Sequence, residues 1–392
     1  MIYWTTVGGI MKKNIIFIYL HTFLSTFILF YVCDTLFYIE RGLSSSQYIS
    51  FVGIAFLVKL IFEIPFGILA DKYNKKLQLL ISNVFFIIAT IIFICSNNYF
   101  AFIIAVIINA INNSMSSGIV NSILYESLEN KKEFNKTLFY NSFFYNISYM
   151  LAMIIGGYVG DKLGLVYTYY FTLIPFTLDF LVLIIIKVNN SKNAKSNNNL
   201  LILKNGIKEI ANNPYLIKLI LTSSVLFSGI KLMEESHPEY SANIGISVFI
   251  IGVYTAFILV FCIIGSYIGS RINKNNYPLV LKIHPILSGI CILLVGILNS
   301  YLGIIFILLI YIFSESFDNI MISELHNNIS SKSRVTVESI NQFVLAIFGL
   351  LFSILMAILL KFISVAVMYI LIGSIMILYG LLNIIILKIR KD

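Results

Sequence analysis

Long apolar runs dominate the chain, and each is long enough to cross a lipid bilayer as a single helix. An α-helix rises about 1.5 Å per residue, so about 20 apolar residues cross a hydrocarbon core of about 30 Å. The runs do not alternate between apolar and polar residues, which favours helices over the strands of a membrane barrel. The first six predicted spans are 14–37, 46–70, 77–96, 99–124, 138–159 and 165–187. The second six are 215–233, 246–270, 278–299, 301–324, 340–360 and 364–387.

The composition agrees with a chain whose main solvent is lipid. It is 59% hydrophobic and only 11% charged, whereas a soluble domain has about 25% charged residues. We therefore predict an all-α polytopic membrane protein with twelve transmembrane helices, which excludes a soluble enzyme, a β-barrel porin and a single-anchor receptor. The cysteines show no disulfide or metal-ligand spacing, so we expect no metal and no cofactor. They are Cys33, Cys95, Cys262 and Cys291.

One polar stretch divides the predicted spans into two sets of six. We predict an N-terminal six-helix bundle at 1–187, a cytoplasmic linker at 188–214 and a C-terminal six-helix bundle at 215–392, the two bundles being related by pseudo-symmetry. Within the linker, 200–211 has apolar residues interspersed with lysines. This pattern predicts an amphipathic helix on the inner membrane face, and a solvated linker is the alternative.

The positive charges predict the orientation. If the N-terminus is inside, most Lys and Arg residues fall on the inner side, and the outer side receives only Arg41, Lys162, Lys231 and Lys361. This bias predicts cytoplasmic termini and a multi-pass protein of a bacterial inner membrane, in contact with lipids and not with nucleic acid. We expect a monomer without a cleavable signal peptide. Met11, followed by Lys12 and Lys13, is an alternative start to Met1.

A short motif lies between the second and third spans, Gly67-Ile-Leu-Ala-Asp71-Lys-Tyr-Asn-Lys75-Lys76. It resembles the major facilitator superfamily, whose loop at this place carries Gly-x-x-x-Asp-x-x-x-(Arg/Lys)-(Arg/Lys). Gly67 would permit close helix packing, and Asp71 would lie at the positive N-terminal end of a neighbouring helix. Lys75 and Lys76 would anchor the loop at the inner surface. Such a latch would hold the two halves together on the cytoplasmic side, and an ordinary basic loop is the alternative.

Other stretches resemble the drug and macrolide efflux branch of this superfamily. They are 117–128, at the end of the fourth helix, and 333–339, before the eleventh. A weaker copy of the loop motif, without its carboxylate, occupies 265–274 in the second half. The chain departs from many proton-coupled drug exporters in having no arginine in the fourth span and no Gly-x-x-x-Gly-Pro in the fifth. The glycines there remain suited to close helix approach; they are Gly156, Gly157 and Gly160.

Ionisable residues within membrane spans are energetically costly, so each is a candidate for substrate binding or ion coupling. The candidates are His21, Asp34, Lys59, Glu63, Asp179, Glu315 and Asp318. Lys59 and Glu63 share a helix face, where an internal salt bridge is the alternative role. For Asp34 the alternative is a position at the outer surface of the membrane, in contact with water.

Glu315 and Asp318 stand three residues apart on one face of the tenth span. Two close carboxylates can bind a cation or hold one proton between them, because like charges disfavour double ionisation. A capped helix end is the alternative. By the two-half symmetry this helix aligns with the fourth span, where polar side chains occupy the corresponding place. These are Asn109, Asn112 and Asn113.

These features predict a secondary active transporter that works by alternating access. The preferred function is proton-coupled efflux of an amphipathic small molecule or drug, and uptake of a nutrient or metabolite is the alternative. We expect no enzymatic activity, because the histidines are scattered and show no catalytic cluster. An ATP-driven pump is disfavoured because the sequence has no phosphate-binding Gly-x-x-x-x-Gly-Lys-(Ser/Thr) loop. A channel is a further alternative.

Overall fold

A computed structural model describes residues 2–72, 74–128, 130–188, 207–329 and 334–389. All regular secondary structure in these ranges is helical, and twelve segments are long and apolar enough to cross a membrane. The predicted all-α fold with twelve spans is therefore confirmed. Most of the predicted linker helix at 200–211 lies outside the described residues.

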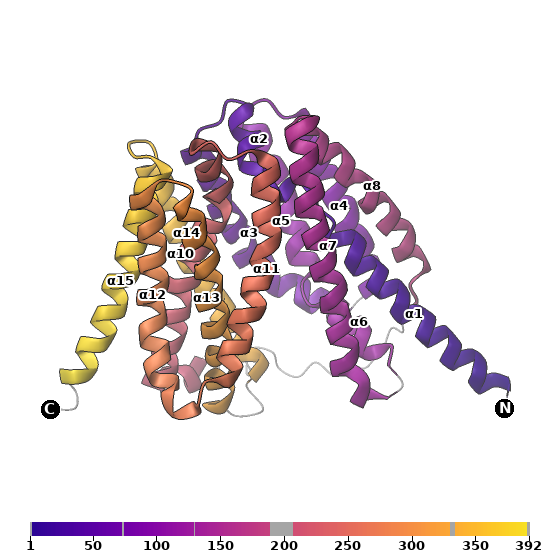
Figure 1. The fold of residues 1–392 in the computed structure, drawn as a ribbon. Helices are drawn as coiled ribbons and strands as arrows, with labels where there is room; N and C mark the ends of the chain where they lie inside the picture. Colours follow the sequence, from indigo (N-terminus) through magenta and orange to yellow (C-terminus); the bar gives the residue numbers. More distant parts are fainter. Residues whose placement is uncertain (1, 73, 129, 189–206, 330–333, 390–392) are drawn as a thin grey trace. The chain divides into compact units, whose positions relative to one another are not determined.

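The helices of the first half of the chain follow the predicted order (Figure 1). They are α1 (Ile2–Thr26), η1 (Leu29–Val32), α2 (Asp34–Glu40), α3 (Ser45–Lys72), α4 (Lys75–Cys95), α5 (Tyr99–Ser116), α6 (Ile119–Glu126), η2 (Lys131–Glu133), α7 (Phe134–Lys162) and α8 (Leu165–Ile185). The second half contains α10 (Pro214–Asn243), α11 (Val248–Arg271), η3 (Lys274–Asn276), α12 (Tyr277–Leu298), α13 (Leu302–Asn327), α14 (Arg334–Leu359) and α15 (Val365–Ile389).

Asparagine side chains fix where three of these helices begin. Asn74 Oδ1 accepts hydrogen bonds from the first backbone N–H groups of α4, Asn98 does so for α5 and Asn213 for α10. The first N–H groups of a helix have no partner within the helix, so a side-chain acceptor at this position stabilises the start by about 1 kcal/mol. Pro214 then occupies the first turn of α10, where its missing N–H has no cost.

The contacts divide the chain into two compact units. Unit 1 comprises 1–43, 57–195 and 248–256, and unit 2 comprises 44–56, 196–247 and 257–392. In unit 1, α1 packs against α7 and α8, while α4 packs against α5 and α8. In unit 2, α12 packs against α13 and α15, and α10 contacts α12, α13, α14 and α15. Each unit therefore has its own helical core.

The first turns of α3 belong to unit 2, whereas the rest of this helix belongs to unit 1. Ser46 Oγ donates a hydrogen bond to Ala357 O of α14 at 2.5 Å. Two further contacts with α14 are close: a Cβ on Gly53 would lie 3.2 Å from Ser353 Cβ, and a Cβ on Gly349 would lie 2.5 Å from the Phe56 ring. These contacts fix the start of α3 on α14.

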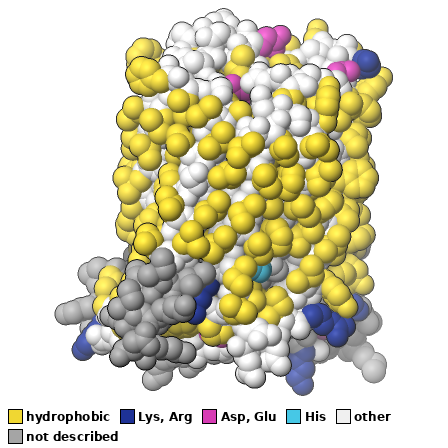
Figure 2. Space-filling view, turned by 60° about the vertical axis from the view of Figure 1, so that its left-hand side comes forward, with side chains coloured by type: hydrophobic (Ala, Val, Ile, Leu, Met, Phe, Trp, Pro, Cys, Tyr) yellow, Lys and Arg dark blue, Asp and Glu magenta, His cyan; other side chains and the backbone are white. Residues whose placement is uncertain are grey.

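The molecular surface carries many large apolar side chains. Ile16, Phe100 and Ile263, for example, are more than half exposed. The face drawn in Figure 2 shows a broad band of hydrophobic side chains, with Lys and Arg gathered mainly below it and Asp and Glu near its upper edge. A soluble protein rarely exposes a contiguous apolar surface of this extent, whereas lipid-facing helices require one.

The first and fourth spans are interrupted, where the sequence predicted continuous helices at 14–37 and 99–124. The helix α1 ends at Thr26, and η1 and α2 follow it. In the fourth span, Gly118 adopts a left-handed conformation with φ +71° between α5 and α6. Glycine has no Cβ to disfavour that conformation, so it supplies the break in the helix.

The interruption in the first span is stabilised by side chains from other helices. Leu29 N donates to Thr172 Oγ1 of α8 at 3.0 Å, and Ser148 Oγ of α7 donates to Phe23 O at 2.5 Å. Backbone groups released from a helix within a membrane require such partners. The sequence around this break contains neither glycine nor proline, so the local pattern did not indicate it.

The expected close approach at the glycines of α7 is confirmed. A Cβ on Gly156 would lie 2.1 Å from Leu29 O, one on Gly157 would lie 3.0 Å from Gly252 Cα of α11, and one on Gly160 would lie 3.1 Å from a methyl carbon of Val248. At Gly67, in contrast, no described atom lies within 4 Å of such a Cβ. The described residues thus give no close contact at Gly67, and the packing expected there stays a prediction.

The seventh span is longer than predicted. The helix α10 continues to Asn243, ten residues beyond the expected end at 233, and includes Glu234, Glu235 and Glu239. These charged residues lower the local hydropathy, so the sequence pattern assigned them to an outer loop. Lys231, which we expected on the outer side near the end of this span, lies twelve residues before the end of α10.

Candidate functional site

Lys75 of the loop motif is bound within unit 1. Its Nζ forms an ion pair with Glu126 Oε1 of α6 and donates a hydrogen bond to Ser122 Oγ at 2.7 Å. The side chain is only 13% exposed and links α4 to α6. Its predicted role as an anchor at the inner surface stays a prediction. Asp71 lies near the end of α3, and its side chain is outside the described residues. The proposed carboxylate latch at Asp71 therefore stays a prediction.

Two predicted candidates on α3 form a local ion pair. Lys59 Nζ lies 3.6 Å from Glu63 Oε2, one helical turn away. Both side chains are about one third exposed. The salt bridge considered from the sequence is thus present, and it leaves no charge unbalanced within the pair.

Asp34 begins the short helix α2. Its Oδ1 accepts a hydrogen bond from Thr35 N at 2.7 Å. A carboxylate in the first turn interacts favourably with the positive end of the helix dipole. Part of the role of Asp34 is therefore to stabilise the chain where it resumes a helical path after η1.

The asparagines of the fourth span lie just before its interruption. Asn112 Oδ1 accepts from Ser82 Oγ of α4 at 2.6 Å, and Asn112 Nδ2 donates to Asn113 Oδ1 at 3.3 Å. The buried Oδ1 of Asn109 has no hydrogen-bond partner among the described residues. On the polar face of the fourth span, the Oδ1 and Nδ2 atoms of Asn112 thus have hydrogen-bond partners, whereas Asn109 Oδ1 has none among the described residues.

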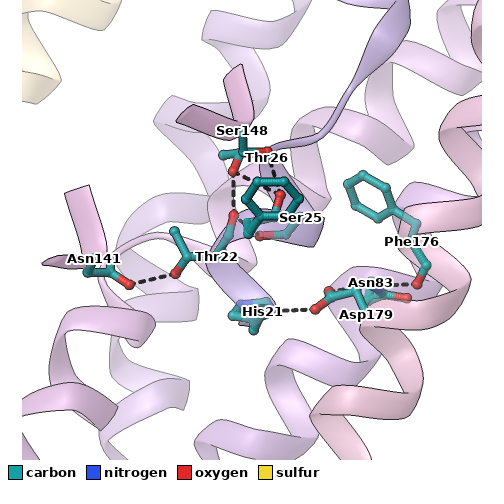
Figure 3. Close-up of polar contacts among 10 residues, drawn as sticks. His21, Thr22, Ser25, Thr26, Asn83, Asn141, Ser148, Phe176 and Asp179 are labelled. Atoms are coloured by element: carbon teal, nitrogen blue, oxygen red, sulfur yellow. Dashed lines mark hydrogen bonds and ion pairs between the residues drawn. The ribbon is translucent and has the colours of Figure 1, made fainter. Parts of the chain in front are cut away.

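A buried polar network of unit 1 centres on Asp179 (Figure 3). Its Oδ1 lies 2.7 Å from His21 Nδ1 of α1, and its Oδ2 accepts from Asn83 Nδ2 of α4 at 2.8 Å. Asn83 Nδ2 also lies 3.2 Å from the carbonyl oxygen of Phe176. Asp179 is only 1% exposed. Three helices, α1, α4 and α8, therefore converge on one buried carboxylate.

A neighbouring hydrogen bond extends this network to α7. Thr22 Oγ1, next to His21, donates to Asn141 Oδ1 at 2.7 Å (Figure 3). A buried carboxylate is tolerated when an opposite charge or several donors satisfy it, and a His–Asp pair can in addition hold a mobile proton. The sequence indicated His21 and Asp179. It did not single out Asn83 or Asn141, whose only signal was an amide within an apolar helix.

Glu315 and Asp318 both lie on α13, partly buried, as their spacing predicted. Ser266 Oγ of α11 donates to Glu315 Oε2 at 3.4 Å. The two helices cross closely there, because a Cβ on Gly265 would lie 2.5 Å from Ile312 O. Glu315 and Asp318 also interact electrostatically. The pair lies within the helix and not at its capped end, since α13 continues to Asn327.

The longer α10 brings together charged residues that the sequence did not identify as a site. Lys231 Nζ lies 3.1 Å from Glu234 Oε2 and 2.7 Å from Glu235 Oε1. Tyr48 OH, from the first turns of α3, donates to Glu235 Oε2 at 3.1 Å, and Ser45 Oγ donates to Glu239 Oε1 at 2.5 Å. Correct placement of the end of the seventh span would have revealed this cluster.

Comparison with known proteins gives consistent matches. A family profile described as the Major Facilitator Superfamily matches residues 15–337. An "Uncharacterized transporter" of Buchnera aphidicola is 28% identical over 114 residues, a match that covers only 29% of this chain and 28% of that relative.

Solved structures match over nearly the whole chain. A POT family transporter in complex with a thioalcohol-conjugated peptide has a TM-score of 0.77 at 13% identity, covering 97% of each chain. A mutant form of the nucleoside transporter NupG has a TM-score of 0.74 at 14% identity, covering 95% of this chain and 98% of that one. At such identities the likeness shows the fold alone.

Proposed function

Because this chain belongs to the major facilitator superfamily and is a multi-pass membrane transporter, we propose that it exports an amphipathic small molecule, such as a drug, driven by proton entry. The carrier would expose its substrate site alternately to the two sides of the membrane. Protons would be carried by Glu315 and Asp318, because a pair of nearby carboxylates in a low-dielectric site can hold one proton between them.

The observation that carries this proposal is the distribution of charge along the spans. Carboxylates lie well inside the helices of unit 2, at Glu315 and Asp318. The arginines of the described residues lie at helix ends or connections, at Arg41, Arg271 and Arg334. Binding of a strongly anionic substrate favours arginine, so this distribution instead supports an apolar or cationic substrate and proton coupling.

Export is tested in inside-out membrane vesicles. Vesicles that contain the protein should accumulate a fluorescent amphipathic drug when the interior is acidified, and the accumulation should collapse when a protonophore removes the gradient. Vesicles without the protein serve as the control. Accumulation that is unaffected by the protonophore would contradict proton coupling. If the vesicles moved only a nutrient, and in the opposite direction, the protein would be an uptake carrier and not an exporter.

We also propose that the chain is oriented in the membrane with both termini in the cytoplasm. Figure 2 supports it, because positive side chains gather mainly at one edge of the apolar band. Cys95 is exposed and should be replaced by serine first. Single cysteines should then react with an impermeant maleimide in intact cells at one set of positions and not at another. The reactive set is Arg41, Lys162 and Lys361, and the protected set is Lys75, Lys195 and Arg334. Labelling of a cysteine at position 195 in intact cells would show that the chain has the opposite orientation in the membrane.

A further inference from the structure

Two lysines of unit 2 lie close together on neighbouring helices. Lys218 is in the first two turns of α10, and Lys282 is in the first two turns of α12. The two side chains are close enough to interact electrostatically, and they carry the same charge. Because α10 and α12 pack against each other within unit 2, the fold itself brings these charges together. We call Lys218 and Lys282 the lysine pair.

Contacts with α15 fix the position of Lys218. Its Nζ donates a hydrogen bond to Asn383 O of α15 at 3.2 Å. One turn away, Thr222 Oγ1 of α10 lies 3.1 Å from Tyr379 OH of α15. These two contacts hold the start of α10 against the last turns of α15. The ammonium group of Lys218 therefore has a defined place at the junction of three helices.

No carboxylate of the described residues forms an ion pair with either member of the lysine pair. Glu324 of α13 lies at the same end of unit 2, and its Oε2 accepts a hydrogen bond from Tyr215 OH at 2.6 Å. Two like charges that are held together repel each other, and the repulsion is stronger near the low dielectric of a membrane than in water. An anion bound between the two ammonium groups would remove this cost.

Exposed apolar side chains border the lysine pair. Ile217 of α10, Leu279 of α12 and Leu382 of α15 are 38%, 56% and 55% exposed. Leu279 stands one turn before the lysine of α12, on the same face of that helix. Exposed apolar side chains at the end of a membrane span lie against lipid chains. An anion at the lysine pair would therefore have lipid as its neighbour.

The sequence that follows Asn383 is also basic. It contains Lys388, Arg390 and Lys391 against one acidic residue, Asp392. Figure 2 shows Lys and Arg side chains gathered mainly below the apolar band. Cations in this position attract the anionic headgroups of phospholipids, and basic pockets between membrane helices bind such headgroups.

We propose that the lysine pair binds the phosphate of an anionic phospholipid, whose acyl chains lie against the exposed apolar side chains of α12 and α15. One phosphate between the two ammonium groups replaces their repulsion by attraction and links α10, α12 and α15 at one end of unit 2. In the proposed orientation this lipid belongs to the inner leaflet. The proposal does not depend on which molecule the protein transports.

The test uses the purified full chain in detergent, freed of bound lipid, and native mass spectrometry to measure lipid binding. Dioleoyl phosphatidylglycerol carries one negative charge, and dioleoyl phosphatidylcholine has the same chains without net charge. The anionic lipid should bind with at least 10-fold higher affinity. A lysine near an anionic headgroup contributes about 5-fold in affinity. Lys218→Gln and Lys282→Gln should each weaken binding of phosphatidylglycerol by about this factor, and the double variant should weaken it at least 10-fold.

Lys274→Gln is the matched control, because Lys274 is an exposed lysine of η3, which precedes α12 in the same unit. It should leave binding unchanged. Lys282→Arg keeps the charge and should retain the affinity of the parent. In Lys218→Gln the amide retains an N–H donor for Asn383 O, so the contact between α10 and α15 can persist. The elution profile in size-exclusion chromatography confirms that each variant is folded.

Three outcomes would overturn the proposal. The first is equal affinity for the two lipids. The second is weakening by Lys274→Gln as large as that by Lys282→Gln, which would show only a general attraction to a basic surface. The third concerns a free anion as the ligand. Phosphatidylglycerol should raise the unfolding temperature of the parent but not of the double variant, and inorganic phosphate should not. If inorganic phosphate raised it equally, the lysine pair would bind free anions and not a lipid.

Discussion

Vesicles that contain the double variant Glu315→Gln, Asp318→Asn should fail to accumulate drug against its gradient and should still exchange drug downhill. A proton-driven carrier requires a carboxylate that takes up a proton on one side of the membrane and releases it on the other. The double variant retains hydrogen-bonding amides, so Ser266 keeps an acceptor at position 315. Uphill transport should fall to the level of vesicles without protein, a loss of at least 10-fold.

Two controls make this result specific. Asp161→Asn removes a carboxylate at the end of α7 and should leave uphill transport intact. Downhill exchange of the drug by the double variant is the second control, because it shows that the variant still folds and binds its substrate. Uphill accumulation equal to that of the parent would show that coupling resides elsewhere. The buried pair of His21 and Asp179, at 2.7 Å, would then be the next candidate.

The second large effect concerns stability, at the crossing of α7 and η1. Gly156→Ala should lower the unfolding temperature markedly, because the added Cβ would lie 2.1 Å from Leu29 O and 2.9 Å from Leu29 C. Backbone atoms cannot move aside as a flexible side chain can. Overpacking of this kind costs about 1–3 kcal/mol and sometimes more. Thermal unfolding in detergent, followed by the fraction of monodisperse protein, measures the change.

Gly67→Ala is the matched control for this measurement. Both glycines lie within helices, but no described atom approaches a Cβ at Gly67 within 4 Å. In the interior of a helix alanine is favoured over glycine by about 1 kcal/mol. Gly67→Ala should therefore unfold at the same temperature or above it. If the two variants unfolded at the same temperature, the helix crossing at Gly156 would accommodate the added Cβ without loss of stability.

The spans and the tight α7 crossings could be predicted because their signals are local. Hydropathy over about 20 residues identifies a helix, and glycines one turn apart indicate close packing. The extension of α10 was missed for the same reason, since Glu234, Glu235 and Glu239 lower the local average. Within the packed unit their carboxylates bind Lys231, Tyr48 and Ser45.

The interruption of the first span could not be predicted, because its cause lies far away in the sequence. Thr172, Ser148 and Gly156 together accommodate the released backbone of α1 and η1. The same limitation applies to the site in unit 1. Asp179 was a candidate because an acid in an apolar span is rare, but its partners could only be identified once α1, α4 and α8 were placed side by side.

The packing of α3 bears on how the protein is made. A ribosome completes this helix long before α14, yet Ser46 and Phe56 find their partners at Ala357 and Gly349 of α14. The beginning of α3 can therefore contact α10 only after some 190 further residues are synthesised, and α14 only after some 300. Its apolar side chains tolerate lipid during that interval. Ser46 does so less readily, and its docking on α14 belongs to the last steps of assembly, when translation is nearly complete.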